Sequence, residues 1–197
     1  MIKLLREYIW RQSSGNKVLS LFILTNLVYV FMLVVSIPKV MGFADGLKLL
    51  DMLPSGYDAD YVNHLFETLG TNGRSVYLYH QIPADMFYPG LFSVTYCLLF
   101  TWFLKKINRH ESPVFYFSFL PLIAGVSDYV ENLGIITMLN EYPNISQETV
   151  SITNTFSMLK SASTTFYFFA LLVVIVVFVS EYLKKEKIWF RPQLIDF

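Results

Sequence analysis

The stretch that decides the fold reads AGVSDYVENLG (residues 124–134). It lies inside an apolar run, residues 114–139, and a helix needs about 20 such residues to cross a bilayer. Asp128, Glu131 and Asn132 stand at positions i, i+3 and i+4, so a helix places them on one face. Ionisable groups inside a membrane are costly and usually face the interior of a helix bundle. The pattern therefore predicts a polar site enclosed between membrane helices.

The composition is typical of an integral membrane protein. Hydrophobic residues make up 54% of the 197 residues and charged residues 15%, whereas soluble domains carry about 25% charged residues. Fifteen basic and fifteen acidic residues cancel, so no excess positive charge indicates a nucleic acid as partner. The single cysteine, Cys97, excludes an internal disulfide. The three histidines are scattered, and we expect neither a metal site nor any other cofactor.

Four apolar segments are expected to cross the membrane: residues 18–38, 85–104, 114–139 and 160–181. Ser112 followed by Pro113 is a start signal for the third helix. The basic, amphipathic residues 1–17 are expected to lie along the membrane surface or to lead into the first span. The sequence thus predicts one all-α domain, an integral membrane antiparallel four-helix bundle.

The connection between the first two spans, residues 39–83, is expected to be a partly helical outer loop. Asp58 is a candidate cap for an amphipathic helix that stops at Gly70. A second short helix carries Tyr77 and is predicted to end or kink at Pro83. The other long connection, residues 141–153, is predicted to be a polar loop.

The distribution of basic residues predicts the orientation of the bundle. Eleven of the fifteen lie in the N-terminal segment, in the linker 105–109 or in the C-terminal tail. By the positive-inside rule, both termini are cytoplasmic and the two long connections face outward. We expect a plasma membrane or an inner membrane, with the lipid bilayer itself as the first partner.

Polar residues of several segments are expected to meet in the outer half of the membrane. Asp128 follows Pro113 by 15 positions, or about 22 Å along an α-helix. Asp85 and Lys160 begin the second and fourth spans on the same side of the membrane. The predicted region comprises three acids, two bases and one amide: Asp85, Asp128, Glu131, Arg74, Lys160 and Asn132. Two interpretations stay open: an ion-paired network that fixes helix register, or a cavity for a lipid headgroup, a cationic or sterol-like ligand, or a proton.

Short motifs occur here in a fairly specific order: Leu69-Gly70-x-x-Gly73-Arg74-x-x-Tyr77, then Asp85 and Pro89, then Asp128-x-x-Glu131-Asn132. Between residues 57 and 139 the chain resembles a family of small, functionally uncharacterised four-span membrane proteins. The resemblance assigns no activity. It implies that the polar residues of these motifs belong to one site: Arg74, Tyr77, Asp85, Asp128, Glu131 and Asn132.

Three functions are compatible with the sequence. The first is a polar, acidic pocket that faces outward and binds a lipid or an amphiphilic small molecule. The second is a membrane-embedded enzyme that modifies a lipid, with Asp128 or Glu131 as general acid or base and Arg74 holding an anionic headgroup. The third is an accessory or assembly subunit whose charged network and aromatic faces contact another membrane protein.

Overall fold

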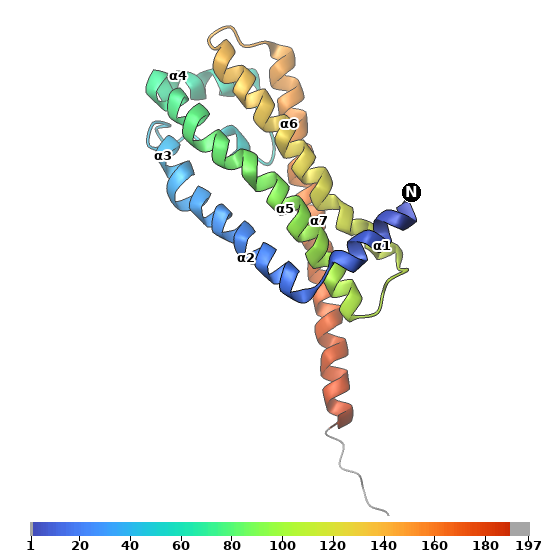
Figure 1. The fold of residues 1–197 in the computed structure, drawn as a ribbon. Coiled ribbons are helices and arrows are strands. Elements are labelled where there is room, and N and C mark those ends of the chain that lie inside the picture. The colour runs from blue at the N-terminus through green and yellow to red at the C-terminus, as the bar shows by residue number, and fades with distance from the viewer. Residues whose placement is uncertain (1, 190–197) are drawn as a thin grey trace, which may run out of the picture.

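The computed structural model describes residues 2–189, and every regular element in this range is a helix (Figure 1). Within these residues, four helical segments are long and apolar enough to cross a membrane: Gly15–Met41, Ala59–Lys106, Pro113–Glu141 and Gln147–Lys184. The predicted all-α class is confirmed for the described residues, and so are four apolar helical segments of sufficient length to span a membrane. Such helices fit an integral membrane protein.

The first spanning segment consists of α2 (Gly15–Phe31), a π-helical turn (Met32–Ser36) and α3 (Ile37–Met41). Its side chains are strongly apolar and yet largely uncovered by the rest of the protein: Leu19 is 59% exposed and Leu27 63%. A continuous apolar face of this kind is unfavourable in water. It is expected where the neighbour is lipid.

The second spanning segment starts earlier than predicted. The helix α4 (Ala59–Val76) continues through a π-helical turn (Tyr77–Gln81) into α5 (Ile82–Lys106). Asp58 caps α4 as predicted, its Oδ1 accepting a hydrogen bond of 2.8 Å from the Tyr61 N–H. Of the two alternatives predicted at Pro83, an end or a kink, the end is wrong, because a wider π-helical turn precedes this proline and the chain stays helical beyond it.

Gly70 divides α4 into two helical stretches that meet at a kink, so the predicted stop of the amphipathic helix at Gly70 is confirmed. Its φ of 60° and ψ of −176° lie outside the helical region and are accessible mainly to glycine. The helix resumes directly after the bend, and the residues that follow lead straight into α5. The non-helical part of the predicted outer loop 39–83 is therefore confined to the connection between α3 and α4, residues 42–58, which also holds a short 3₁₀ turn (Leu50–Met52).

The third spanning segment begins as predicted at Pro113. Ser112 Oγ accepts a hydrogen bond of 3.3 Å from the Val114 N–H. The first seven residues form 3₁₀ turns (Pro113–Phe119), and α6 (Leu120–Glu141) follows. A 3₁₀ turn rises about 2.0 Å per residue, more than an α-helix, so Asp128 lies farther from Pro113 than the α-helical estimate of its depth predicts.

The fourth helix also starts earlier than predicted. The helix α7 spans Gln147–Trp189, so the expected polar loop 141–153 shrinks to residues 142–146, and Lys160 lies inside the helix. The reason is that the polar segment before Lys160 has its own buried face: Val150, Thr153 and Ser157 are 2% exposed or less. A hydropathy profile does not register a helix that packs through hydroxyl groups.

Successive spanning segments run in opposite directions (Figure 1). The central helix is α5, which packs against α2, α6 and α7, while α6 and α7 pack against each other along their length. We call the end that carries the connections 42–58 and 142–146 the loop end. The opposite end carries α1 (Ile2–Gln12) and the connection 107–112, and we call it the basic end.

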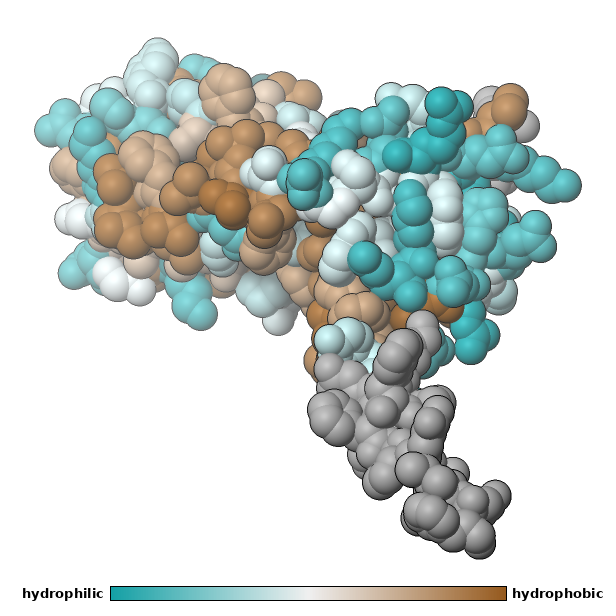
Figure 2. Space-filling model, turned by 60° about the horizontal axis from the view of Figure 1, so that its bottom comes forward, coloured by the Kyte–Doolittle hydropathy of each residue, from teal (hydrophilic) through white to brown (hydrophobic). Residues whose placement is uncertain are grey.

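The amphipathic N-terminal segment forms the helix α1, which packs across the basic end. Arg6 lies over the Phe115 ring at 5.0 Å, and Lys105 Nζ donates a hydrogen bond of 3.3 Å to the Trp10 carbonyl. Figure 2 shows hydrophilic side chains gathered on the side of α1 and hydrophobic ones on the side of α2. This division resembles the division of a membrane protein into headgroup and lipid contact zones.

Candidate functional site

A polar cavity of about 510 Å³ lies at the loop end, between the first spanning segment, α5, α6 and α7. Met52 and Pro54 of the connection 42–58 also line it. Four ionisable side chains line this cavity: Asp51, Asp85, Asp128 and Lys160. We refer to it below as the polar cavity.

Lys160 of α7 bridges two carboxylates of α6, Asp128 and Glu131. Its Nζ lies 3.2 Å from Asp128 Oδ1 and contacts Glu131 Oε2 as well. The two acids can share one cation because they lie one helical turn apart on the same face. The Glu131 side chain is fully buried, and its Oε1 has no hydrogen-bond partner among the described residues. One ammonium group thus forms ion pairs with two carboxylates.

Asp85 of α5 faces the polar cavity without a partner. The residue is only 5% exposed, and its carboxyl group has neither a hydrogen bond nor an ion pair within the part of the chain that the structure describes. Its backbone carbonyl does have a partner, because Asn132 Nδ2 donates a hydrogen bond of 3.3 Å to it. Asn132 therefore joins α6 to α5 and leaves the Asp85 side chain at the cavity wall.

The connection 42–58 supplies a carboxylate that the sequence analysis did not single out. The short 3₁₀ turn directs Asp51 to the polar cavity, and the Tyr77 hydroxyl donates a hydrogen bond of 3.1 Å to its Oδ1. Tyr77, a predicted site residue, is fully buried behind the cavity. One acid among apolar neighbours in LLDML (residues 49–53) was the only signal for Asp51.

Tyr57 lies in the same connection and is buried among these groups. Its N–H donates a hydrogen bond of 2.9 Å to Asn154 Oδ1 on α7, whereas its hydroxyl has no partner among the described residues. Burial, with the nearby Glu131 charge, raises the pKa of Tyr57 far above its usual value of 10.0. The phenol therefore stays neutral throughout the physiological pH range.

The structure does not bring Arg74 into the polar cavity. Arg74 Nη1 donates a hydrogen bond of 2.6 Å to the Phe66 carbonyl, and the guanidinium group lies over the Tyr142 ring at 4.2 Å. The carbonyls of a helical turn that ends at a bend need other donors, and Phe66 lies in the turn before Gly70. Arg74 therefore stabilises the bent helix, and the described contacts include no ion pair between it and an acid.

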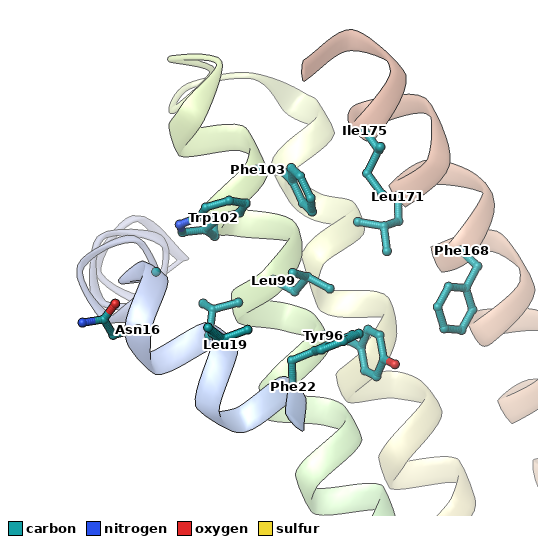
Figure 3. Close-up of a pocket in the computed structure, with 12 residues that line it drawn as sticks. Asn16, Leu19, Phe22, Tyr96, Leu99, Trp102, Phe103, Phe168, Leu171 and Ile175 are labelled. Carbon is teal, nitrogen blue, oxygen red and sulfur yellow. The ribbon is translucent and has the colours of Figure 1, made fainter. Parts of the chain in front are cut away.

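A second cavity, of about 620 Å³, lies between α2 and α7 toward the basic end, with α5 as its floor. Figure 3 shows Leu19 and Phe22 of α2 on one side, Phe168 and Leu171 of α7 on the other, and Trp102 on α5. We call it the apolar cavity, because nearly all of its lining is hydrocarbon or aromatic ring. The sequence analysis did not single out the residues that line this cavity.

The two cavities are neighbours along α5. Phe92 lines the polar cavity and Tyr96 lines the apolar one. These two rings contact each other with centroids 4.6 Å apart, and they are four positions apart on one helix face. A single turn of α5 therefore separates the polar cavity from the apolar cavity.

The chain matches no family model, no curated protein and no solved structure. Among the described residues, no three His, Cys, Asp or Glu side chains are arranged to hold a metal ion. Of the predicted site residues, the structure places five together at the polar cavity or directly behind it: Asp85, Asp128, Glu131, Asn132 and Lys160. Tyr77 joins them through Asp51.

Proposed function

We propose that this integral membrane protein binds a lipid or another amphiphilic small molecule in the groove between α2 and α7. One observation carries the proposal: a cavity lined by charged groups is followed, one helical turn along α5, by a cavity lined by apolar groups. Both volumes fall within the range of about 300–1,000 Å³ that is common for ligand sites. The pair matches a molecule with a polar head and a hydrocarbon tail.

A purely structural ion-pair network explains only part of this arrangement. It accounts for Lys160 and its two carboxylates, which join α6 to α7. It does not account for Asp85, which contributes no ion pair among the described residues and borders open volume. A charge inside the membrane costs about 2.5–3.5 kcal/mol on insertion scales. A carboxyl group that makes no contact within the bundle therefore favours a role in ligand binding over a structural role.

The loop end is the outward side in this proposal. Basic side chains concentrate at the basic end, in α1, in the linker 105–109 and after the fourth span. By the positive-inside rule, this distribution favours cytoplasmic termini in a plasma or inner membrane. The polar cavity would then open near the outer headgroup layer and the apolar cavity toward the membrane core.

Native mass spectrometry of the purified protein tests the proposal. Leu19→Trp places a large side chain at the apolar cavity, and Leu27→Trp is its matched control on α2, with similar exposure and outside both cavities. We expect a bound amphiphile in the wild type and in Leu27→Trp, and its loss from Leu19→Trp. The same amphiphile bound equally to all three proteins, or to none of them, would contradict the proposal.

The lipid-modifying alternative is supported by two carboxylates that border the same cavity, Asp85 and Asp128. Glu131 is a weaker candidate for a general acid or base, because it is fully buried and does not line the cavity. Turnover of a lipid by the wild type, with a pH profile that shifts in Asp128→Asn, would establish this activity. Turnover that is the same in both proteins would remove it.

A further inference from the structure

We infer that the ligand is a single-chain amphiphile with an ammonium headgroup, held by Asp85 and Asp51 in the polar cavity, and with its chain in the apolar cavity. The inference rests on the proposed function and names the chemical class of the ligand. It follows from the charge balance of the polar cavity, from its aromatic wall and from the direction of the groove.

The charge balance of the polar cavity favours a cation. Three carboxylates and one ammonium group line it, and Glu131 lies directly behind. Lys160 is already shared by Asp128 and Glu131, and no other Lys or Arg lines the cavity in the described part of the chain. An ammonium headgroup would give Asp85 the partner that it lacks, whereas an anionic headgroup would meet several like charges.

Two tyrosine rings form part of the wall of the polar cavity. Tyr29 of α2 and Tyr88 of α5 both line the cavity, and their rings stack with centroids 5.4 Å apart. The negative face of an aromatic ring attracts an ammonium ion, with a larger effect where water is excluded. Together with Asp85, the two rings make the chemistry of this cavity suited to an organic cation.

The groove also has the length and direction of an amphiphile. On the first spanning segment, Leu33 lines the polar cavity and Leu19 lines the apolar one. Their 14 positions correspond to about 21 Å of helix, compared with about 15 Å for half of a hydrocarbon core of about 30 Å. Leu19 and Phe168, on opposite sides of the groove, are 59% and 43% exposed, so the ligand would enter sideways from the bilayer.

Fluorescence quenching of Trp102, which lines the apolar cavity, tests the inference. Trp10→Phe and Trp189→Phe leave Trp102 as the sole tryptophan. The protein is placed in phosphatidylcholine nanodiscs with a dodecyl chain that carries bromine at its end and either an ammonium, a carboxylate or a hydroxyl headgroup. We expect the ammonium probe to quench Trp102 at concentrations at least about tenfold below the other two.

Asp85→Asn should lower the affinity for the ammonium probe about tenfold, which is equivalent to about 1.4 kcal/mol. Glu141→Gln, which removes an exposed carboxylate outside both cavities, is the control and should leave the affinity unchanged. If Asp85→Asn fails to fold, Asp51→Asn on the connection 42–58 gives the same test. Because the wild type and the variants are compared with the same probe in the same lipid, the partitioning of that probe cancels from this comparison.

The outcomes separate the headgroup assignment from the proposed function. Equal quenching by all three probes, or a stronger effect of the carboxylate probe, would overturn the ammonium assignment and leave the amphiphile site intact. An ammonium preference that persists in the folded Asp85→Asn and Asp51→Asn variants would overturn it too. No quenching of Trp102 by any probe would overturn both the inference and the proposed function.

Discussion

Replacing Lys160 with methionine should destabilise the helix bundle by about 3–5 kcal/mol, the usual cost of removing one partner of a buried ion pair. Methionine keeps the length of the side chain and removes its charge. Two carboxylates then lose their cation, and burial limits how well water can solvate them, because the Asp128 side chain is only 10% exposed and that of Glu131 is fully buried. The upper part of the range is expected, since one ammonium group serves both acids.

A charge-neutral triple variant separates the charge effect from packing. Asp128→Asn and Glu131→Gln, combined with Lys160→Met, remove all three charges with little change in shape. Buried ion pairs are often no more stabilising than neutral groups of similar volume, so the triple variant should regain most of the loss. Glu131→Gln alone keeps the contact of 3.2 Å between Lys160 and Asp128 and should cost less than Lys160→Met.

The measurement is reversible unfolding in mixed micelles, followed by circular dichroism while the fraction of denaturing detergent is increased. Lys39→Met is the matched control, because Lys39 is exposed on α3 and forms no ion pair among the described residues; its effect should be close to zero. A Lys160→Met protein within about 1 kcal/mol of the wild type would refute the reasoning. So would a triple variant that is no more stable than Lys160→Met.

Three further predictions concern the packing around the cavities. Tyr57→Phe should stabilise the protein by up to about 1 kcal/mol, because it removes a buried hydroxyl without a partner among the described residues, whereas Tyr77→Phe should cost about 1–2 kcal/mol by removing a buried hydrogen bond; thermal unfolding of the two variants checks the opposite signs. Gly125→Ala should cost about 1–3 kcal/mol, because a Cβ there would lie 1.9 Å from Ser93 Oγ and 2.8 Å from a backbone oxygen. Adding Ser93→Ala should recover only part of this loss in the same unfolding assay, because the clash with the backbone oxygen remains. Gly70→Ala should cost about 1–3 kcal/mol through backbone strain at a φ of 60°, and unchanged stability in denaturant would contradict the bend.

The sequence predicts the existence of the four helices better than it predicts their ends. The first spanning segment and the start signal at Ser112 need only local information: a long apolar run in one case, and a cap followed by proline in the other. The start of α7 depends on tertiary packing. Thr153 packs so closely against Gly134 that a Cβ there would lie only 1.9 Å from its Oγ1. This contact with α6 makes a polar sequence the first part of the long helix α7.

Some residues of the candidate site can also be predicted from local sequence, whereas others depend on tertiary structure. Asp128, Glu131 and Asn132 share a face through helical spacing alone, and Lys160 is close in depth, so their proximity can be predicted from periodicity. Asp51 could not be placed from the sequence, because its position depends on the path of the connection 42–58. Arg74 was expected with the acids, but the bend at Gly70 gives it a nearer acceptor in the α4 backbone.

The groove itself follows from an unequal use of small residues in the bundle. Gly125 lets α6 approach α5, and Gly134 lets it approach α7, whereas α2 has no glycine after its first residue. The helix α2 packs against α5 and makes few contacts with α7.

A buried hydrogen bond of 2.7 Å between the Thr25 and Thr95 hydroxyl groups joins α2 to α5, and the Thr25 hydroxyl also donates a longer one of 3.5 Å to the Leu91 carbonyl. Thr25 lies between the stretch of α2 that lines the apolar cavity and the stretch that lines the polar cavity. A hydrogen bond at this point holds the helix in place without filling the space toward α7. The groove can therefore stay open along α2 while the bundle remains closed through α5, α6 and α7, which is the geometry that sideways entry of an amphiphile requires.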